Sequence, residues 1–179
     1  MKATVYIATS LDGFIARKDG DIKWLHHPDY MIEGEDYGYS GLMASVDALV
    51  MGSGTFDVVS SFAGDWPYGE KRVIVLSSRQ LNTPPELSAT VEQMGGSPID
   101  ILAELGERGM QHLYIDGGKT AQAFLSAGLI DELIITRVPL ILGEGIPLFA
   151  PVEQDIELIH VKTEAYTSGL VQSHYHIRR

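Results

Sequence analysis

The sequence contains no cysteine, which excludes disulfides, thiolate metal sites and a cysteine nucleophile. It has no apolar run long enough to span a membrane, and its N-terminus alternates like a strand, unlike a signal peptide. It also lacks the three spaced glycines of a Rossmann turn and the Gly-Lys-Ser/Thr of a Walker loop. Without a visible signal peptide or membrane span, the expected location is the cytoplasm. Without a Rossmann turn or Walker loop, any nucleotide site is expected to use another arrangement.

Positive charge is scarce. The formal net charge is -11, from 13 Lys and Arg against 24 Asp and Glu, and no basic cluster offsets it. Such a chain is repelled by nucleic-acid backbones and anionic lipid surfaces, so we expect neither as a partner. The 179 residues suit one domain, residues 1–179, with a sizeable core.

Apolar strands alternate with helical segments along most of the chain. The expected strands cover 3–9, 46–51, 72–76, 112–115 and 130–138, with a short one at Val91. The expected helices cover 55–61, a segment from N-cap Ser97 to Gly109, and one from the Gly117-Gly118 turn to Gly128. Residues 29–44 would hold another helix, which three glycines weaken. Residues 157–162 and 170–177 alternate around a turn, as a hairpin does. The pattern predicts an α/β sheet covered on both faces.

Three strands end in residues suited to binding phosphate. Asp116-Gly117-Gly118-Lys119 and Gly52-Ser53-Gly54-Thr55 each lead from a strand into a helix, and Leu76-Ser77-Ser78-Arg79 adds hydroxyls and a guanidinium. Glycines let backbone N–H groups approach a ligand, and helix N-termini favour pyrophosphate. Each turn alone is common, but ligands of open α/β sheets bind at the carboxyl ends of strands. Together the three predict one nucleotide site.

The chain resembles the dihydrofolate reductase superfamily, and within it the reductase domain of riboflavin biosynthesis. Its residues 139–149, PLILGEGIPLF, are similar to the P-x-x-L-G-x-G-x-P-L-F signature of the riboflavin branch, and further similarity covers 7–16, 48–55, 73–78 and 116–119. The resemblance implies a three-layer α/β fold with a mostly parallel central sheet and an antiparallel C-terminal hairpin. It also implies a homodimer and an NADPH-dependent oxidoreductase. The substrate would be a ribosylaminopyrimidinone such as 5-amino-6-(5-phosphoribosylamino)uracil, or a related pteridine-like compound.

The resemblance also implies roles for the cofactor-binding residues. Ala8 would offer backbone groups to the carboxamide, and Ile15 would cover the nicotinamide. Leu76, Ser77, Ser78 and Arg79 would lie near the adenosine, the last three as candidates for its 2′-phosphate. The two helix starts would surround the remaining phosphates with Gly52, Ser53, Gly54, Thr55, Asp116, Gly117, Gly118, Lys119 and Thr120.

On the substrate side, Asp29 and Thr136 match the carboxylate and threonine that bind the pyrimidine and support its protonation in folate-reducing members. Trp24 matches a tryptophan at the end of the mobile loop. Asp29 would otherwise only cap a helix. Glu33 stands where an aromatic residue is expected, and this departure counts against folate itself as the substrate.

Two alternative functions remain open. One is a true dihydrofolate reductase, and the other is a nucleotide-binding protein that lacks efficient chemistry. Separately from these functions, three histidines are candidates for a zinc site. His174 and His176 share one strand face, and His160 would pair with them across the hairpin. A half-exposed strand face is the simpler interpretation, since no carboxylate or cysteine stands beside them. We therefore predict no metal.

Overall fold

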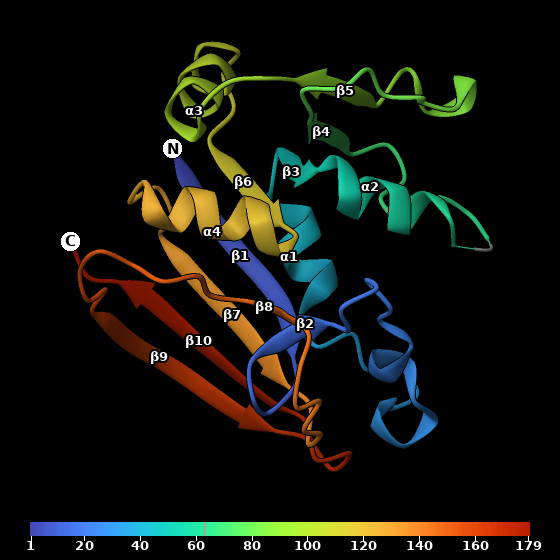
Figure 1. Cartoon of the computed structure of the whole chain (residues 1–179), viewed down its shortest axis with the longest axis vertical. Helices are drawn as coiled ribbons and strands as arrows, with labels where there is room; N and C mark the ends of the chain where they lie inside the picture. The colour runs from blue at the N-terminus through green and yellow to red at the C-terminus, as the bar shows by residue number, and fades with distance from the viewer. Residues whose placement is uncertain (63) are drawn as a thin grey trace.

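The computed structural model describes residues 1–62 and 64–179, and Figure 1 shows their arrangement. Short 3-10 turns cover Lys23–His26, Pro28–Tyr30 and Pro85–Leu87. The helices are α1 (Tyr39–Ser45), α2 (Ser53–Ser60), α3 (Pro98–Glu107) and α4 (Gly118–Ser126). The strands are β1 (Lys2–Thr9), β2 (Phe14–Ala16), β3 (Ala48–Gly52), β4 (Arg72–Leu76), β5 (Val91–Met94), β6 (His112–Asp116), β7 (Glu132–Arg137), β8 (Ile146–Pro147), β9 (Leu158–Ala165) and β10 (Val171–Ile177).

Eight strands form the central sheet in the order β5-β4-β3-β6-β1-β7-β10-β9. The first six of these run parallel, and β10 and β9 add an antiparallel hairpin at one edge. The two remaining strands, β2 and β8, form a separate antiparallel pair beside the main sheet. This confirms the predicted α/β class, with its mostly parallel sheet and C-terminal antiparallel hairpin.

The two faces of the sheet bury separate apolar clusters. Helices α3 and α4 cover one face, where Ile101 and Phe124 pack against alternate residues of the strands. Helices α1 and α2 cover the other, where Leu42 and Phe56 pack against the intervening residues. Figure 1 shows α4 lying across the strands on the first side. The result is the predicted three-layer arrangement. Within the two described ranges, no helix is long and apolar enough to cross a membrane.

The segment 29–44 is the main error of the sequence-based prediction. The structure has only the 3-10 turn at Pro28–Tyr30 and the short helix α1 in place of one helix over this range. Gly34 and Gly38 adopt φ angles of +78° and +83°, and Tyr37 between them has φ +56°. A chain in the left-handed region at three such closely spaced positions cannot continue a right-handed helix.

Other boundaries agree closely with the sequence pattern. Ser97 caps α3 in a capping box with Asp100, as its spacing predicts. Gly109 and Gly128 follow α3 and α4 with φ angles of +86° and +68°. Helix α2 begins at Ser53, two residues earlier than expected.

Candidate functional site

Strand register brings the predicted strand ends to one edge of the sheet, here termed the carboxyl edge. Gly52 at the end of β3 is paired with Leu76 of β4, and Met51 is paired with Asp116 of β6. On the other side of β1, Ala8 is paired with Thr136 of β7. Residues separated by more than a hundred positions therefore meet along a line where ligands of parallel sheets bind.

The two glycine-led helix starts at this edge touch each other. A Cβ atom added at Gly117 would overlap Thr55 Oγ1, and one added at Gly52 would lie 3.2 Å from Thr120 Oγ1. Gly117 has φ +85°, which L side chains rarely adopt. The N-termini of α2 and α4 thus lie next to each other. Because the first backbone N–H groups of a helix have no partner within it, this junction can receive an anion.

Ile15 lies over the start of α4. Its Cδ1 atom is 2.6 Å from the position that a Cβ atom of Gly118 would take. The segment that carries Ile15 is fixed to residues 139–149 by backbone hydrogen bonds from Leu11 N–H to Leu140 O (2.7 Å) and from Leu148 N–H to Gly13 O (2.9 Å). The structure therefore groups Ile15 with the glycine turns.

Asp12 strengthens the link between these two loops. Its carboxylate accepts hydrogen bonds from the Ser10 hydroxyl (2.6 Å) and from the N–H groups of Gly143 (2.8 Å) and Leu142 (3.1 Å). The Ser10 hydroxyl, followed by these amides, holds the pKa of Asp12 below its usual value. The exposed carboxylate thus remains charged while it joins two segments 130 residues apart.

The end of β4 is built differently from the two glycine turns. The Ser77 hydroxyl accepts a hydrogen bond from Arg79 N–H at 3.1 Å, which closes a tight local turn. The Arg79 guanidinium forms an ion pair with Asp57 of α2, and both side chains are exposed. Ser78 is also exposed. The cation that we predict near a 2′-phosphate is therefore tethered at the surface of α2.

A buried carboxylate lies under the glycine junction. Asp116 Oδ1 accepts a hydrogen bond from Gly117 N–H at 2.8 Å, and Oδ2 accepts one from the Tyr68 hydroxyl at 3.3 Å. The residue keeps some surface exposure, but protein atoms surround its carboxylate, and this burial raises its pKa. Burial, followed by the charge of Asp116, also raises the pKa of Tyr68. Sequence reasoning did not single out Tyr68.

The predicted substrate residues occupy two different environments. Thr136 is buried, and its hydroxyl accepts a hydrogen bond from Gln172 Nε2 at 3.0 Å. The same Gln172 amide donates to Tyr37 O at 3.0 Å. Asp29, by contrast, has 80% of its side chain exposed and faces His27 at 3.5 Å. The structure therefore does not join Asp29 to Thr136, and Glu33 is exposed as well.

Trp24 is buried against Val138 and Leu170, next to the carboxyl end of β7. Its indole Nε1–H is buried and has no hydrogen-bond partner in the described part of the chain. Buried donors without partners are rare in folded proteins, so this N–H marks a place for a ligand atom or a water.

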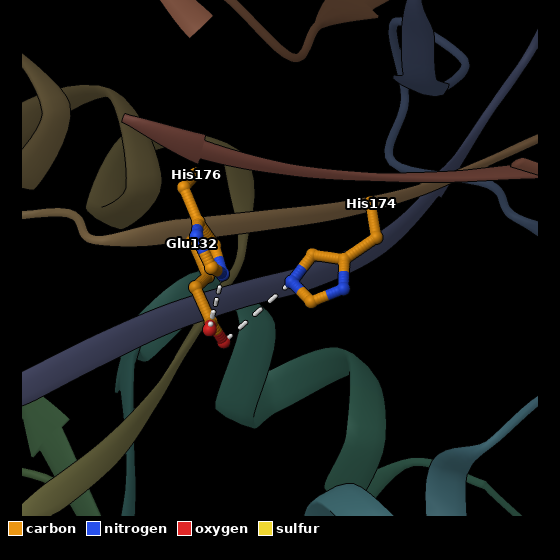
Figure 2. Close-up of side chains that lie close together, drawn as sticks. All are labelled: Glu132, His174 and His176. Atoms are coloured by element: carbon orange, nitrogen blue, oxygen red, sulfur yellow. Dashed lines mark ion pairs between the residues drawn. The ribbon is translucent and has the colours of Figure 1, made fainter. Parts of the chain in front are cut away.

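The histidine prediction needs correction. His160 is paired with Tyr175, so it does not share a face with His174 and His176. The statement that no carboxylate stands beside those two histidines is also wrong. Glu132 Oε1 lies 3.0 Å from His176 Nε2, because antiparallel register places the two residues directly opposite each other. Figure 2 shows the three side chains together.

The fold and the carboxyl edge define a dihydrofolate-reductase-like α/β protein. Dihydrofolate reductase from Enterococcus faecalis, solved with NADP(H) and RAB-propyl, superposes with a TM-score of 0.63 at 17% identity, over 99% of this chain and 97% of that chain. Residues 2–172 match the RibD C-terminal domain family. The chain belongs to that family.

Relatives at higher identity agree with this assignment. A solved "Putative riboflavin biosynthesis protein" from Shewanella sp. PV-4 is 44% identical, with full coverage of both chains and a TM-score of 0.92. YwjB of Bacillus subtilis, which is uncharacterized, is 33% identical over 97% of each chain. The riboflavin biosynthesis protein RibD of Corynebacterium ammoniagenes is 29% identical over 82% of this chain and 45% of its own length.

Proposed function

We propose that this protein is an NADPH-dependent reductase that transfers a hydride to a ribosylaminopyrimidinone or a related pteridine-like compound. The observation that carries the proposal is the contact between the helix starts at Gly52–Thr55 and Gly117–Thr120, with Ile15 against Gly118. Two adjacent helix N-termini offer several N–H donors and positive dipole ends to a pyrophosphate. The family match and the RibD relative favour riboflavin-type chemistry.

The residues at the junction fit a dinucleotide. Gly117 and Gly118 have no side chains to block a phosphate, and Lys119 is exposed at the start of α4. Local donors are necessary because the chain as a whole carries a net charge of -11. NADPH, when bound, supplies the hydride, and the protein positions it and excludes water.

We propose that residues around the end of β7 bind and orient the substrate. Trp24 Nε1–H would donate to the substrate or to a water beside it, because it has no partner within the described residues. Thr136 and Gln172 would orient the substrate through their shared hydrogen bond. Asp29 remains our proposed proton donor, and that role requires its exposed side chain to turn inward upon binding.

The experiment is a measurement of NADPH oxidation with 5-amino-6-(5-phosphoribosylamino)uracil and, separately, with dihydrofolate. We expect turnover of the first compound, and Asp29→Asn should lower kcat by about 100-fold if Asp29 supplies the proton. Glu153→Gln changes an exposed carboxylate in the same way and serves as the matched control. Unchanged turnover in Asp29→Asn removes Asp29 from the mechanism.

The two alternative functions give different results in the same assay. Turnover of dihydrofolate alone would indicate a true dihydrofolate reductase. NADPH binding without turnover of either compound would indicate a nucleotide-binding protein. The Trp24 N–H is buried and has no partner within residues 1–62 and 64–179, which favours a protein with a ligand on the substrate side.

We also propose a cytoplasmic homodimer that uses the C-terminal hairpin. Leu158, Ile159 and Val161 of β9 leave 40%, 45% and 44% of their surface exposed, and an edge strand with apolar side chains is suited to pairing. Light scattering of the purified chain tests the dimer. A mass of 19.6 kDa would contradict it.

A further inference from the structure

Three potential metal ligands meet at the end of the sheet opposite the carboxyl edge, here termed the amino edge. Glu132 opens β7, and His176 lies directly across from it on β10. His174 is two residues away along β10, so its side chain points to the same face. Figure 2 shows both imidazole rings turned toward the one carboxylate.

The spacing of these groups approaches that of a coordination sphere. One ligand atom from each residue lies within 4.8 Å of the other two. Glu132 Oε1 is 3.0 Å from His176 Nε2, and Oε2 is 3.8 Å from His174 Nε2. Ligand atoms about 2.0–2.2 Å from a tetrahedral ion lie roughly 3.3 Å apart. The two observed separations from the carboxylate, 3.0 and 3.8 Å, lie on either side of that value.

His174 gives separate evidence, beyond the spacing of the three residues, that a ligand belongs at this place. Its Nε2 atom is buried and makes no hydrogen bond within residues 1–62 and 64–179. At 3.8 Å, the Glu132 oxygen is too far away to serve as one. A buried ring nitrogen of this kind calls for a partner that the described residues do not supply.

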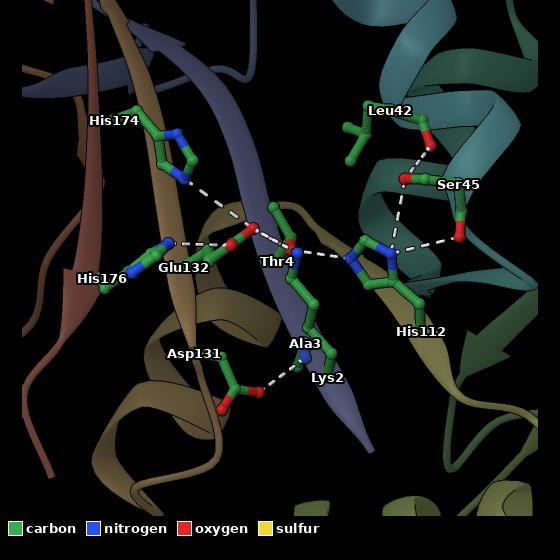
Figure 3. Close-up of polar contacts among 10 residues, drawn as sticks. All are labelled: Lys2, Ala3, Thr4, Leu42, Ser45, His112, Asp131, Glu132, His174 and His176. Carbon is green, nitrogen blue, oxygen red and sulfur yellow. Dashed lines mark hydrogen bonds and ion pairs between the residues drawn. The ribbon is translucent and has the colours of Figure 1, made fainter. Parts of the chain in front are cut away.

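Further groups hold the carboxylate in place, as Figure 3 shows. Lys2 Nζ lies 2.9 Å from Glu132 Oε2, and the Thr4 hydroxyl donates to the same oxygen at 3.1 Å. Burial alone raises the pKa of Glu132, but Lys2 and Thr4 outweigh it and leave the pKa lowered. Both contacts use Oε2, so Oε1 remains directed at His176. The neutral Thr4 hydroxyl is an outer-shell donor of the kind that commonly orients metal ligands in proteins. The Lys2 ammonium, by contrast, occupies the carboxylate in the absence of an ion.

The cluster is open to solvent on one side. A surface groove of about 730 Å³ is lined by Met1, Lys2, Gln111, Asp131, Glu132, His176, Ile177 and Arg179. Two of these residues are the proposed ligands Glu132 and His176, so an ion can enter from the groove. The groove also leaves a coordination position for water.

We propose that Glu132, His174 and His176 form a binding site for a divalent late transition metal ion of the Zn²⁺ type. Two imidazoles and one carboxylate suit such an ion and are poorly suited to Mg²⁺, which prefers oxygen ligands. The site is separate from the proposed cofactor site and does not depend on the proposed function. It would tie the first strand of the chain, through Thr4, to the last.

The test is titration of tag-free, chelator-treated protein with ZnCl₂ by calorimetry, and with CoCl₂ by visible absorption. We expect one ion per chain, with cobalt absorption bands in the tetrahedral range. His176→Ala and His174→Ala should each weaken Zn²⁺ binding at least about tenfold, since the loss of even outer-shell partners costs that much. His176 is half-exposed, so its variant should fold normally.

His160→Ala is the matched control, because His160 lies on the other face of the hairpin and bonds Thr163 at 2.8 Å. It should bind Zn²⁺ as wild type does. Equal weakening in His160→Ala and His176→Ala, or no binding by wild type, overturns the proposal. If MgCl₂ gave the same heat of binding as ZnCl₂, the heat would come from cations on the acidic surface, and the proposal would also be overturned.

Lys2→Met provides a second check that a folding defect cannot mimic. Lys2 competes with the ion for Glu132, so its loss should raise the Zn²⁺ affinity severalfold. An affinity equal to or below that of wild type overturns Glu132 as a ligand.

Discussion

The two edges of the central sheet are assembled in opposite ways. At the carboxyl edge, short runs such as Gly117-Gly118 supply backbone N–H donors through their local geometry. Each run can be recognised in the sequence from a few neighbouring residues. At the amino edge, the polar cluster is made of isolated side chains that come from four different strands, β1, β6, β7 and β10. Thr4 and Glu132, for example, are 128 positions apart in the sequence and 3.1 Å apart in space.

This difference explains which site is visible in the sequence. A glycine turn after a strand has a local physical reason, because it needs positive φ or a close approach of backbone. A charge or imidazole inside a strand has no such local signature. Glu132 and His176 lie together only because of the register between β7 and β10, and this register cannot be inferred from the sequence. The predictions below test how separate the two edges are, starting with the largest effect on stability.

Gly117→Ala should be the most damaging change. The substitution meets two costs: about 1–3 kcal/mol for an L residue at φ +85° and ψ 146°, a region that is nearly exclusive to glycine, and about 1–3 kcal/mol for overlap with Thr55. Nucleotide affinity should fall with it. Urea unfolding compares this variant with Gly128→Ala, which has φ +68° but no atom within 4 Å and so carries a positive-φ cost without any overlap. Equal losses in the two variants would contradict the contact between the helix starts.

Thr4→Val tests the amino edge in the metal-free protein. Thr4 is buried, and its hydroxyl contacts Glu132 and His112 Nε2, the latter at 2.8 Å. Without the Thr4 hydroxyl, Glu132 and His112 each lose a hydrogen bond. We therefore expect a loss of about 1–3 kcal/mol in the free energy of unfolding. Thr167→Val, at an exposed turn, should stay within about 0.5 kcal/mol. A parallel loss of NADPH affinity in Thr4→Val would show that the two edges are coupled.

Asp116→Asn should change the pH dependence of stability. Burial raises the pKa of Asp116 above its ordinary value of 3.8, so the folded state binds the proton more tightly than the unfolded state does. Wild-type stability, relative to the variant, should therefore fall as pH rises from near 3.8 through the raised pKa. The loss amounts to about 1.4 kcal/mol per unit of pKa difference. Urea midpoints measured from acidic to neutral pH check this, and a difference independent of pH would contradict it.

Arg79→Ala should have the smallest effect on stability. Its ion pair with Asp57 is more than half exposed, and such pairs contribute about 0–1 kcal/mol. If Arg79 binds the 2′-phosphate, NADPH affinity should fall about tenfold, as expected for one charged hydrogen bond, while NADH affinity stays the same. Arg178→Ala removes a similarly exposed ion pair at the other edge and serves as the control. Equal affinity of wild type for NADH and NADPH would refute the role of Arg79.

Much of the fold follows from local sequence. The capping box at Ser97 and the hairpin around Thr167–Gly169 have their causes within a few residues, and both are confirmed. The helix predicted over 29–44 is wrong because Gly34 and Gly38 act as left-handed turn residues, whereas Gly41 is accommodated within α1.

The candidate sites were less accessible to sequence reasoning. The glycine turns were identified, and the structure brings them together, although their role with a cofactor stays a prediction. Gln172 was missed because its two hydrogen bonds, to Thr136 and Tyr37, depend on strand pairing and on a loop 135 residues away. Alternation along β10 places Gln172 on the same face as His174, but it does not reveal what faces them.

Asp12 has a further consequence for the two loops that it joins. The segment with Ile15 cannot swing away alone, because Asp12 and the backbone bonds at Leu11 and Gly13 fasten it to residues 139–149. The run 139–149, which most clearly marks the family, is therefore joined to the segment that we propose covers the nicotinamide. Under the proposed function, the two segments would have to move together whenever a nucleotide binds or leaves.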